Sequence, residues 1–488
     1  MEYFQDSSRA NLPITDDEMG VIQLPRKRHV FSFSPLALGD VIMWLDASDT
    51  STITHSSNVV QTWADKSGNG NDATKNASYN APLTNQDTQN GKNVITFDRS
   101  NGEWLEANSV ASAALSDHTI CYVFKPGDQP TLGLTWCALG GFFQSGANRG
   151  VLFVNSIGYM ENYYSSGSDV VVNRGTINHN EYHTLILSHS GSTVSVYYNG
   201  VLHRTYSAAL EANADQFTIG NDWDSSTPSD QYDGGLAEAL LFGKGLTASQ
   251  ASILHSYWAN KWSVPQGTYL MTLTSKLAGW YDANSPWSIL KNGSDEMGTW
   301  YSRTTNNYSA TQTTGSAKPV WTDSSINGLP AIVASANDFM NLTVGQFSSG
   351  NTSYEIFIVG KSNSDASGAF FVNAGGSTTN TALFVRRDST QLNTGWWSNN
   401  LYAGALDANY HVLHSSYDSS SGREHFIDGA SQGSDSSTTR NTSLGNESIF
   451  DNNASVDGAV AELIITNEKL STSEINGITA ELKTKYAL

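Results

Sequence analysis

The segment DGGLAEALLFGKGLTASQASIL, Asp233–Leu254, is repeated later in this 488-residue chain as DGAVAELIITNEKLSTSEINGI, Asp457–Ile478. Each copy reads as an apolar strand, a short polar turn and the start of a helix. Thr247 and Gln250 have the spacing of a capping box, in which two residues bind each other's backbone N–H groups at a helix start, and the second copy keeps this spacing. The pattern predicts one strand-and-helix unit built twice.

Two further blocks recur in the same order. LGDVIMWLDASD, Leu38–Asp49, is answered by LAGWYDANS, Leu277–Ser285, and the strand pair in Glu181–Gly200 is answered by Asn409–Gly429. Spacings above 200 residues are too long for a solenoid or a propeller blade, so they indicate duplication of a whole domain. We place an N-terminal arm at residues 1–36, a first domain at 37–263 and a second at 268–488, joined by the linker SVPQG.

The composition favours strands over long helices. Glycine is frequent, at 42 residues, and only 15% of residues are charged, whereas the 39% hydrophobic fraction is enough to fill cores. Apolar and polar residues alternate on both sides of the turns HSGS and YNG, which predicts a meander of antiparallel strands. We therefore predict an all-β fold.

The formal net charge is −20, and such an excess of carboxylates repels nucleic acid phosphates, so we expect no nucleic-acid binding. No stretch reaches about 18 consecutive apolar residues, so we expect no membrane insertion. The first residues have neither the basic start nor the apolar run of a secretory signal. Cys121 and Cys137 are the only cysteines; two buried thiols are favoured over one bridge.

Four features together resemble the concanavalin A-like and laminin-G-like jelly rolls, in which two antiparallel sheets pack face to face. They are the WLDASD opening, the loop WADKSGNGNDA at Trp63–Ala73, the strand pair after Glu181 and the closing strand and helix. The second copy has WYSRTTNNYSA, Trp300–Ala310, in place of the loop. The resemblance implies two tandem jelly-roll β-sandwiches that bind glycans or proteins, sometimes with calcium, and less often cleave polysaccharides. Such tandem modules also resemble parts of phage virion proteins: head decorations, fibres and tail adhesins.

The loop WADKSGNGNDA offers oxygen ligands for a hard cation. Asp65, Asn69, Asn71 and Asp72 carry carboxylate or amide oxygens, and two glycines let the backbone bend round an ion. The loop lacks the regular ligand alternation of an EF-hand, and Asn-Gly and Ser-Gly are ordinary turn formers. A plain turn and a calcium site are therefore both open, and calcium is expected only in the first domain because the second copy lacks both aspartates.

Glycan binding needs exposed aromatic rings beside amide and carboxylate groups. Two places have this mix, and their residues are Asp222, Trp223, Asp224, Trp396, Trp397 and Asn399. Tryptophans in a sandwich are more often buried. We expect burial for the tryptophans at repeated positions, which are Trp44, Trp63, Trp280 and Trp300. The stretch around Asp222 also reads as a solvated acidic loop.

A polysaccharide hydrolase or lyase is an alternative function. Jelly-roll glycosidases set their carboxylates two to four residues apart on one strand face, and the sequence has no such E-x-D-x-x-E triplet. Glu103, Glu106, Glu238 and Glu462 are single acids that we expect at the surface or at the rim of a site. We therefore expect no catalytic residues.

The arm contains the basic cluster PRKRH and the apolar run FSFSPLAL, which is too short to form a core. We expect the contacts with a phage capsid or tail protein to be Arg26, Lys27, Arg28, Phe31 and Phe33. Packing on the chain's own domain is the alternative. The sequence thus predicts a non-enzymatic, homo-oligomeric virion-surface protein, assembled in the host cytoplasm, that displays its domains to host-surface glycans. A capsid-cementing decoration that binds no sugar is the other alternative.

Overall fold

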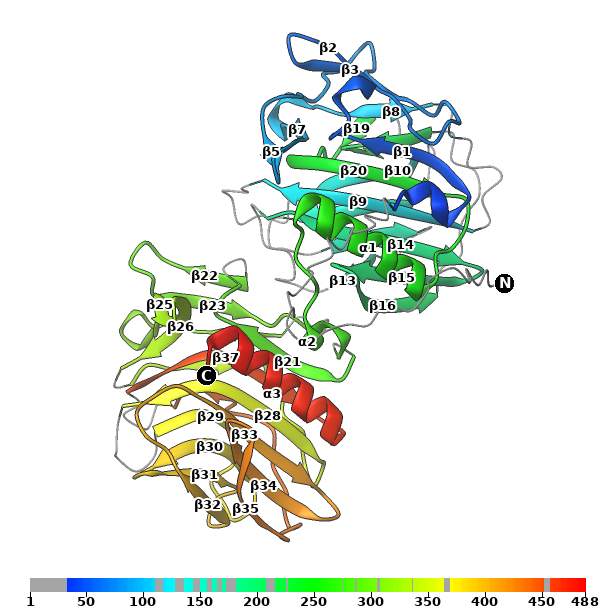
Figure 1. Cartoon of the computed structure of the whole chain (residues 1–488). Coiled ribbons are helices and arrows are strands. Elements are labelled where there is room, and N and C mark those ends of the chain that lie inside the picture. The colour runs from blue at the N-terminus through cyan, green and yellow to red at the C-terminus, as the bar shows by residue number, and fades with distance from the viewer. Residues whose placement is uncertain are drawn as a thin grey trace, which may run out of the picture.

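The structure, a computed structural model, consists almost entirely of antiparallel strands, as the sequence predicts (Figure 1). It describes residues 33–108, 110, 117–127, 136–143, 150–155, 160–164, 169–172, 181–207, 216–224, 227–273, 275–285, 288–304, 308–335, 337–363, 369–451 and 457–488. Within these residues, every sheet draws its strands from one half of the chain only. Each half forms a β-sandwich, so the predicted fold class of tandem jelly rolls is confirmed.

In the first half, two large sheets enclose a core that includes Met43, Leu45, Trp63, Leu105 and Phe217. Across one sheet the strands are β1 (Val41–Asp46), β20 (Gly234–Phe242), β9 (His118–Pro126), β14 (His183–Ser190), β15 (Thr193–Tyr198) and β16 (Val201–Ser207), with β7 (Ile95–Phe97) beside β20. Across the other they are β13 (Asp169–Val172), β12 (Met160–Tyr164), β11 (Gly150–Asn155), β10 (Trp136–Phe143), β17 (Gln216–Ile219), β8 (Leu105–Ala107), β4 (Ala73–Thr74), β3 (Val59–Trp63) and β2 (Ile53–Ser56). Two short ribbons pair β5 (Thr88–Gln89) with β6 (Lys92–Asn93) and β18 (Asp222–Asp224) with β19 (Thr227–Ser229).

The second half repeats the plan around a core that includes Tyr281, Trp300, Ile356, Val372 and Leu463. Its eight-stranded sheet runs β25 (Val320–Ile326), β26 (Leu329–Ala334), β37 (Gly458–Thr466), β28 (Tyr354–Ser362), β33 (His411–Asp418), β34 (Gly422–Ile427) and β35 (Ala430–Asp435), with β21 (Leu277–Asp282) beside β37. Its nine-stranded sheet runs β22 (Ile289–Lys291), β23 (Met297–Tyr301), β24 (Ser309–Thr311), β27 (Met340–Leu342), β36 (Ser448–Ile449), β29 (Ala369–Gly375), β30 (Ala382–Asp388), β31 (Gln391–Gly395) and β32 (Asn400–Ala405).

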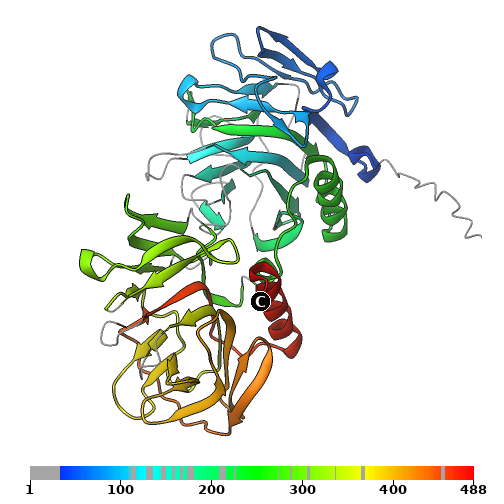
Figure 2. The ribbon, with the colours of Figure 1, turned by 60° about the vertical axis from the view of Figure 1, so that its left-hand side comes forward.

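The helices α1 (Ala248–Trp262) and α3 (Thr472–Tyr486) close the two halves in the same way. Each begins with the complete capping box that the sequence predicts, N-capped by Thr247 and by Ser471. Figure 2 shows each helix lying on the outside of its own sandwich, where α1 buries Leu254, Trp258 and Trp262. None of the helices in the described residues is long and apolar enough to cross a bilayer.

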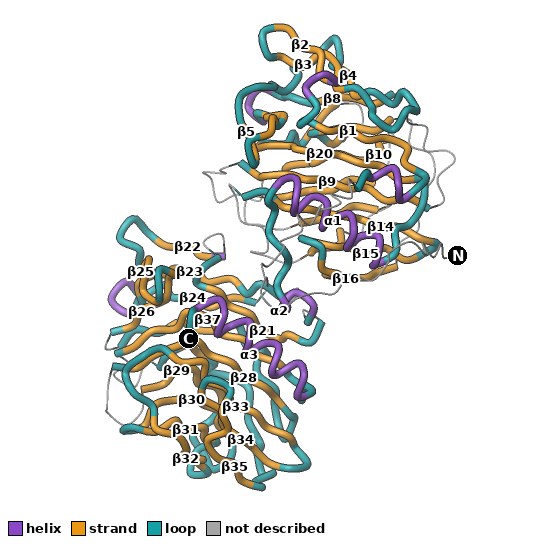
Figure 3. Tube along the Cα trace, in the orientation of Figure 1, coloured by secondary structure: helices purple, strands orange, loops and turns teal. Residues whose placement is uncertain are grey.

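The short helix α2 (Tyr269–Thr272) lies between the two sandwiches (Figure 3). Just before it, the N–H of Gly267 donates to the carbonyl of Asn199 in the first half at 2.7 Å, and Leu270 and Met271 of the helix are buried. The predicted limits of the linker and of the two domains stay a prediction. The remaining helical turns are 3₁₀ helices, which are η1 (Pro35–Leu38), η2 (Thr50–Thr52), η3 (Arg99–Asn101) and η6 (Gly315–Ala317).

The repeated sequence blocks occupy matching places. Strands β14, β15 and β16 form the predicted meander, and β33, β34 and β35 repeat it. The pairing of Trp63 with Ala73, between β3 and β4, is matched by the pairing of Trp300 with Ala310, between β23 and β24. The four repeated tryptophans are buried as predicted, and both cysteines are buried free thiols.

Candidate functional site

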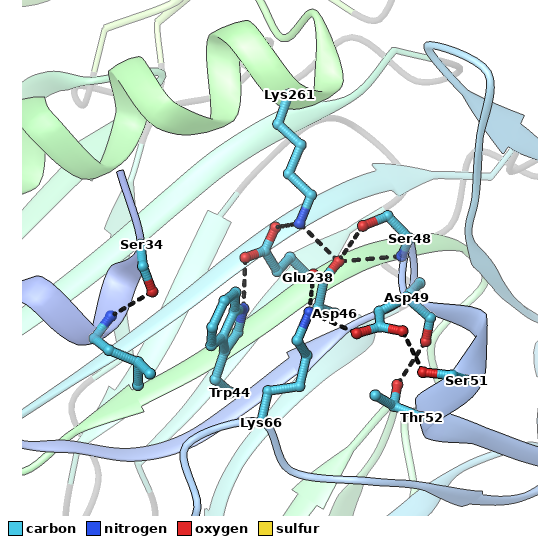
Figure 4. A network of polar contacts seen from close by, with 12 residues as sticks. Ser34, Trp44, Asp46, Ser48, Asp49, Ser51, Thr52, Lys66, Glu238 and Lys261 are labelled. Atoms are coloured by element: carbon cyan, nitrogen blue, oxygen red, sulfur yellow. Dashed lines mark hydrogen bonds and ion pairs between the residues drawn. The ribbon is translucent and has the colours of Figure 1, made fainter. Parts of the chain in front are cut away.

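A buried cluster of charges fastens α1 to the sheet beneath it (Figure 4). Lys261, near the end of α1, binds Asp46 of β1 at 2.7 Å and Glu238 of β20 at 3.0 Å. The indole N–H of Trp44 donates to the other oxygen of Glu238 at 2.7 Å. Burial raises the pKa of Glu238 more than Lys261 lowers it, whereas around Asp46 the attraction of Lys261 and further donors outweighs burial and holds the pKa below its usual value.

The second half contains the same cluster. Lys485 of α3 binds Asp282 and Glu462 at 2.8 Å each, and the equivalent tryptophan indole donates to Glu462 at 2.7 Å. The expectation that Glu238 and Glu462 lie at the surface is therefore wrong, as it is for Glu103, because all three side chains are buried. The two repeated glutamates hold a helix in place.

The loop that the sequence marks as a calcium candidate is fastened to β1 through Asp65. One carboxylate oxygen of Asp65 accepts from the backbone N–H groups of Trp44 and Ser67, at 2.8 and 2.7 Å. The other accepts from the Ser67 hydroxyl at 2.6 Å and from the N–H of Asn71 at 3.1 Å. A carboxylate surrounded by donors is occupied, so a calcium ion would have to displace them.

The other candidate ligands also bind within the loop and to β1. The side-chain amides of Asn69 and Asn71 donate to backbone carbonyls of β1, and Asp72 accepts the N–H of Asp65. In the second half, the hydroxyl of Ser302 takes the place of the Asp65 carboxylate and accepts the N–H of the equivalent tryptophan. The described part of the chain holds no group of three or more acidic, histidine or cysteine side chains that could bind a metal. Calcium stays a prediction.

At the first predicted glycan site, Asp222 is not exposed to solvent as the sequence predicts. Asp222 begins β18 and its side chain is fully buried, because the ribbon of β18 and β19 packs beside β10. Its prediction as an exposed ligand contact is wrong. The side chains of Trp223 and Asp224 lie outside the described residues, and their role stays a prediction.

The hairpin of β31 and β32 puts two adjacent tryptophans in opposite environments. Trp396 is fully buried, with its ring edge-on to Tyr417 at 4.9 Å and beneath the guanidinium of Arg423 at 4.3 Å. Its prediction as a ligand contact is therefore wrong, because the end of β31 directs this ring into the core. The side chain of Trp397 is 44% exposed.

Trp397 and Ser398 form the turn of this hairpin, and both have a positive φ, of 61° and 57°. Positive φ is uncommon for a large side chain, and Asn-Gly is the usual pair in such a turn. The next residue, Asn399, braces the turn: its amide donates to Asn380 at 2.8 Å, and its side-chain oxygen accepts from Arg423 at 2.8 Å. The exposed indole is thus carried on a fixed turn.

The hairpin continues into a polar outer face of the nine-stranded sheet. Directly paired residues of antiparallel strands share a face, so the register defines rows of side chains across the sheet. One row consists of Thr299, Thr311, Asn341, Ser448, Asn373, Phe384, Gly395 and Asn400. The next row contains Arg386, Asn393 and Tyr402. Within these rows Ser448, Phe384 and Asn393 are buried, so the amides and hydroxyls that solvent reaches lie beside the exposed ring of Tyr402.

The end of this face near the hairpin is tightly built. The guanidinium of Arg386 lies 4.7 Å from the ring centre of Phe384, and Asn400 donates to the exposed Tyr402 hydroxyl at 3.1 Å. Gly395 lies under both, since a Cβ there would come within 2.3 Å of the Phe384 ring and of the Asn400 side chain. Sequence reasoning missed Phe384 and Arg386, although their alternation with core residues along β30 was a usable signal.

The end of the arm packs on its own sandwich. Phe33 lies 5.6 Å from Tyr257 of α1, measured between ring centroids, and Lys244 donates to the carbonyl of Leu38. Phe33 therefore packs on the chain's own sandwich and is half-buried there, and its contact with a partner stays a prediction. The other predicted contacts, Arg26, Lys27, Arg28 and Phe31, lie outside the described residues.

Residues 98–252 match the sequence model of the concanavalin A-like lectin/glucanases superfamily, so this segment is a concanavalin A-like jelly-roll domain. No curated protein sequence matches the chain. Solved structures with similar folds include domain 4 of AbnA, a GH43 extracellular arabinanase from Geobacillus stearothermophilus, at 17% identity and a TM-score of 0.31, over 44% of this chain and 98% of that one. The Ruminococcus gnavus IT-sialidase CBM40 is similar at 13% identity and a TM-score of 0.25, over 29% and 84%. The binding domain of botulinum neurotoxin DC is similar at 11% identity and a TM-score of 0.33, over 91% and 97%. At these TM-scores the likenesses carry no argument about ligands.

Proposed function

We propose that this protein is a non-enzymatic carbohydrate-binding protein and that the β31–β32 hairpin of its second sandwich contacts the glycan. The observation that carries the proposal is Trp397, a large ring, 44% exposed, on a turn that is braced from below. Tyr402 and Asn400 lie on the same hairpin. Exposed rings cover the C–H faces of sugars while amides bind their hydroxyls. The superfamily match, to lectins and glucanases, lies in the first half of the chain and supports carbohydrate binding in general rather than this hairpin.

The polar row gives this site length. Neighbouring strands lie about 4.8 Å apart, so the row from Asn400 to Thr299 extends roughly 34 Å across the sheet. Ser448 and Phe384 within the row are buried, so a glycan that lies along it contacts the exposed and half-buried members of the row. Each contact is weak, and display of several copies on one particle multiplies the affinity through effective concentration.

A glycan array tests the proposal with three variants. Trp397→Asn removes the ring but suits a positive φ, so the turn is retained and glycan signal is expected to fall. Tyr402→Ala should have the same effect. Ile253→Ala is the matched control, because this side chain is also exposed but lies on α1 of the first half. Unchanged binding by both hairpin variants, or no binding by the wild-type chain, contradicts the proposal.

We further propose that the sandwiches are displayed on a phage virion and joined to it through the arm, as a homo-oligomer. The resemblance of the tandem modules to virion proteins and the basic PRKRH cluster support this placement. Deleting residues 1–32 keeps Phe33 on Tyr257, so both sandwiches should fold while the protein disappears from purified particles. Retained incorporation refutes the anchor. Incorporation of the full chain without any glycan signal favours a capsid-cementing role instead.

A further inference from the structure

A polar cavity of about 460 Å³ opens on the meander of the second half. Ser416 of β33, Glu424 of β34 and Ser434 of β35 line it. Glu424 pairs directly with both serines, so the three side chains share the face turned away from the core. Asp435 and Lys469 complete much of the wall. The volume lies within the range of sites for small ligands.

The cations of this wall are already bound. The guanidinium of Arg423 binds Asp435 through both Nε and Nη2, and the Nη2 contact is 2.8 Å long. The ammonium of Lys469 binds the buried Glu355 at 3.0 Å and donates to the Ser416 hydroxyl. Each cation of the wall is therefore already paired with a carboxylate.

Two carboxylates of the wall remain. In the part of the chain that the structure describes, Asp418 and Glu424 form no ion pair, and their side chains accept hydrogen bonds from hydroxyl or backbone groups of Ser420 and Ser431. The hydrogen bonds from Ser420 lower the pKa of Asp418 the most, and the charge of Lys469 lowers it less. The cavity thus combines serine hydroxyls with an excess of negative charge.

This cavity adjoins the tryptophan turn. The same Nη2 atom of Arg423 donates to Asp435 in the cavity wall and to the side chain of Asn399 in the turn, at 2.8 Å each. The two acceptor oxygens are therefore no further apart than twice that distance. Ser437 makes a second link, because its N–H donates to Asp435 and its hydroxyl accepts from Asn399. Arg423 and Asp435 lie on the opposite face of β34 and β35 from Glu424 and Ser434, so this link connects the turn with the Asp435 side of the cavity wall.

We propose that the cavity is a second subsite of the glycan site and takes a sugar residue with a free amine. This proposal rests on the proposed function of the Trp397 turn. The protonated amine pairs with Asp418 and Glu424, and the serines bind ring hydroxyls, while Trp397 covers the neighbouring ring. An N-acetylated residue supplies no charge, so binding it desolvates both carboxylates without compensation.

Calorimetry in 0.15 M salt, with tetramers of β-1,4-linked glucosamine, N-acetylglucosamine and glucose, tests this inference. The wild-type chain should bind the glucosamine tetramer about tenfold more tightly than the other two. Asp418→Asn with Glu424→Gln should abolish that preference and leave the binding of the uncharged tetramers unchanged. Asp323→Asn with Glu296→Gln is the control. The protein has a net negative charge that attracts any cation, and this double variant removes the same two charges at positions that do not line the cavity.

The outcomes separate the two proposals. Trp397→Asn should weaken all three ligands, whereas the cavity variant should affect only the amine. An equal loss of amine preference in the control variant, or no preference in the wild type although uncharged tetramers bind, overturns the amine subsite alone. Failure of the wild-type chain to bind any tetramer or any glycan on the array overturns the proposed function and the subsite with it.

Discussion

Replacing Lys261 by methionine should destabilise the first sandwich by an amount that depends on pH. Methionine keeps much of the buried volume but removes the ammonium from between Asp46 and Glu238, which are directly paired across β1 and β20. Lys66 still binds Asp46 at 2.8 Å, so we expect Glu238 to take a proton in the folded state. From an unfolded-state pKa of about 4.3, keeping that proton at pH 7 costs about 3.7 kcal/mol, and this is the upper limit of the change because burial already raises the pKa of Glu238 in the wild-type chain.

The sign of the pH dependence follows from the direction of the shift. The pKa of Glu238 in the folded variant lies above the unfolded value, so the penalty is absent below about pH 4, about 1 kcal/mol at pH 5, and grows as the pH rises. Urea unfolding followed by tryptophan fluorescence at pH 5, 6 and 7 measures it. Lys485→Met makes the same change in the second half and identifies which transition belongs to which sandwich.

Adding Glu238→Gln to the Lys261→Met variant is the decisive control. The glutamine is already neutral and keeps an oxygen for the Trp44 indole, so the pH dependence of the penalty should vanish. The reasoning is refuted if the Lys261→Met penalty is the same at pH 5 and pH 7. It is also refuted if the unfolding free energy of the double variant keeps the same pH dependence, because a different group would then be taking up the proton.

Three further predictions concern the rest of the chain. Arg423→Met should speed hydrogen exchange at residues 396–400 and weaken glycan binding, with little change in the exchange of α3. Equal exchange at residues 396–400 in the variant and the wild type contradicts the role of Arg423 in bracing the turn. Burial lowers the pKa of His203 to about 4 and that of His425 to about 3, so both favour the neutral form when folded. Stability should be fully present above about pH 6.5 and fall towards pH 4 by about 1.4 kcal/mol per pH unit for each histidine, a slope that urea midpoints of His203→Asn and His425→Asn should lack. Asp65→Asn should lower the melting temperature with and without calcium, because four donors lose their carboxylate; a calcium-dependent rise that only the wild type shows would establish the ion.

Local patterns were enough to predict much of the fold. Period-two alternation gives the strands of the meander, and the Thr247 and Ser471 capping boxes give the helix starts, because both depend on residues that are close in sequence. The duplication supplied the long-range information that a single domain lacks. Repeated positions pointed correctly to buried tryptophans, since a side chain kept in both copies at matching places is explained by packing.

The site was harder to predict because it depends on contacts between distant segments. Trp396 and Trp397 are neighbours in sequence, and only the hairpin geometry decides that one is buried and the other exposed. Trp-Ser is not a usual turn pair, so no local rule marks it. The partners that brace the turn, Asn380 and Arg423, lie 19 and 24 residues from Asn399. The burial of Glu238 likewise depends on Lys261 and on Trp44, which is 194 residues away.

The two halves differ where the proposed site lies, and the difference explains why a charge is buried there. Val194 of β15, paired with His189, occupies the position that Arg423 of β34, paired with Tyr417, occupies in the second half. Val194 is an ordinary core residue, whereas the guanidinium of Arg423 is buried and must be desolvated. A buried ion pair gives little net stability compared with apolar packing, so Arg423 is not explained by stability alone. Its bonds to Asn399 and Asp435 hold the tryptophan turn and the cavity wall in one arrangement, which an apolar side chain at this position cannot do.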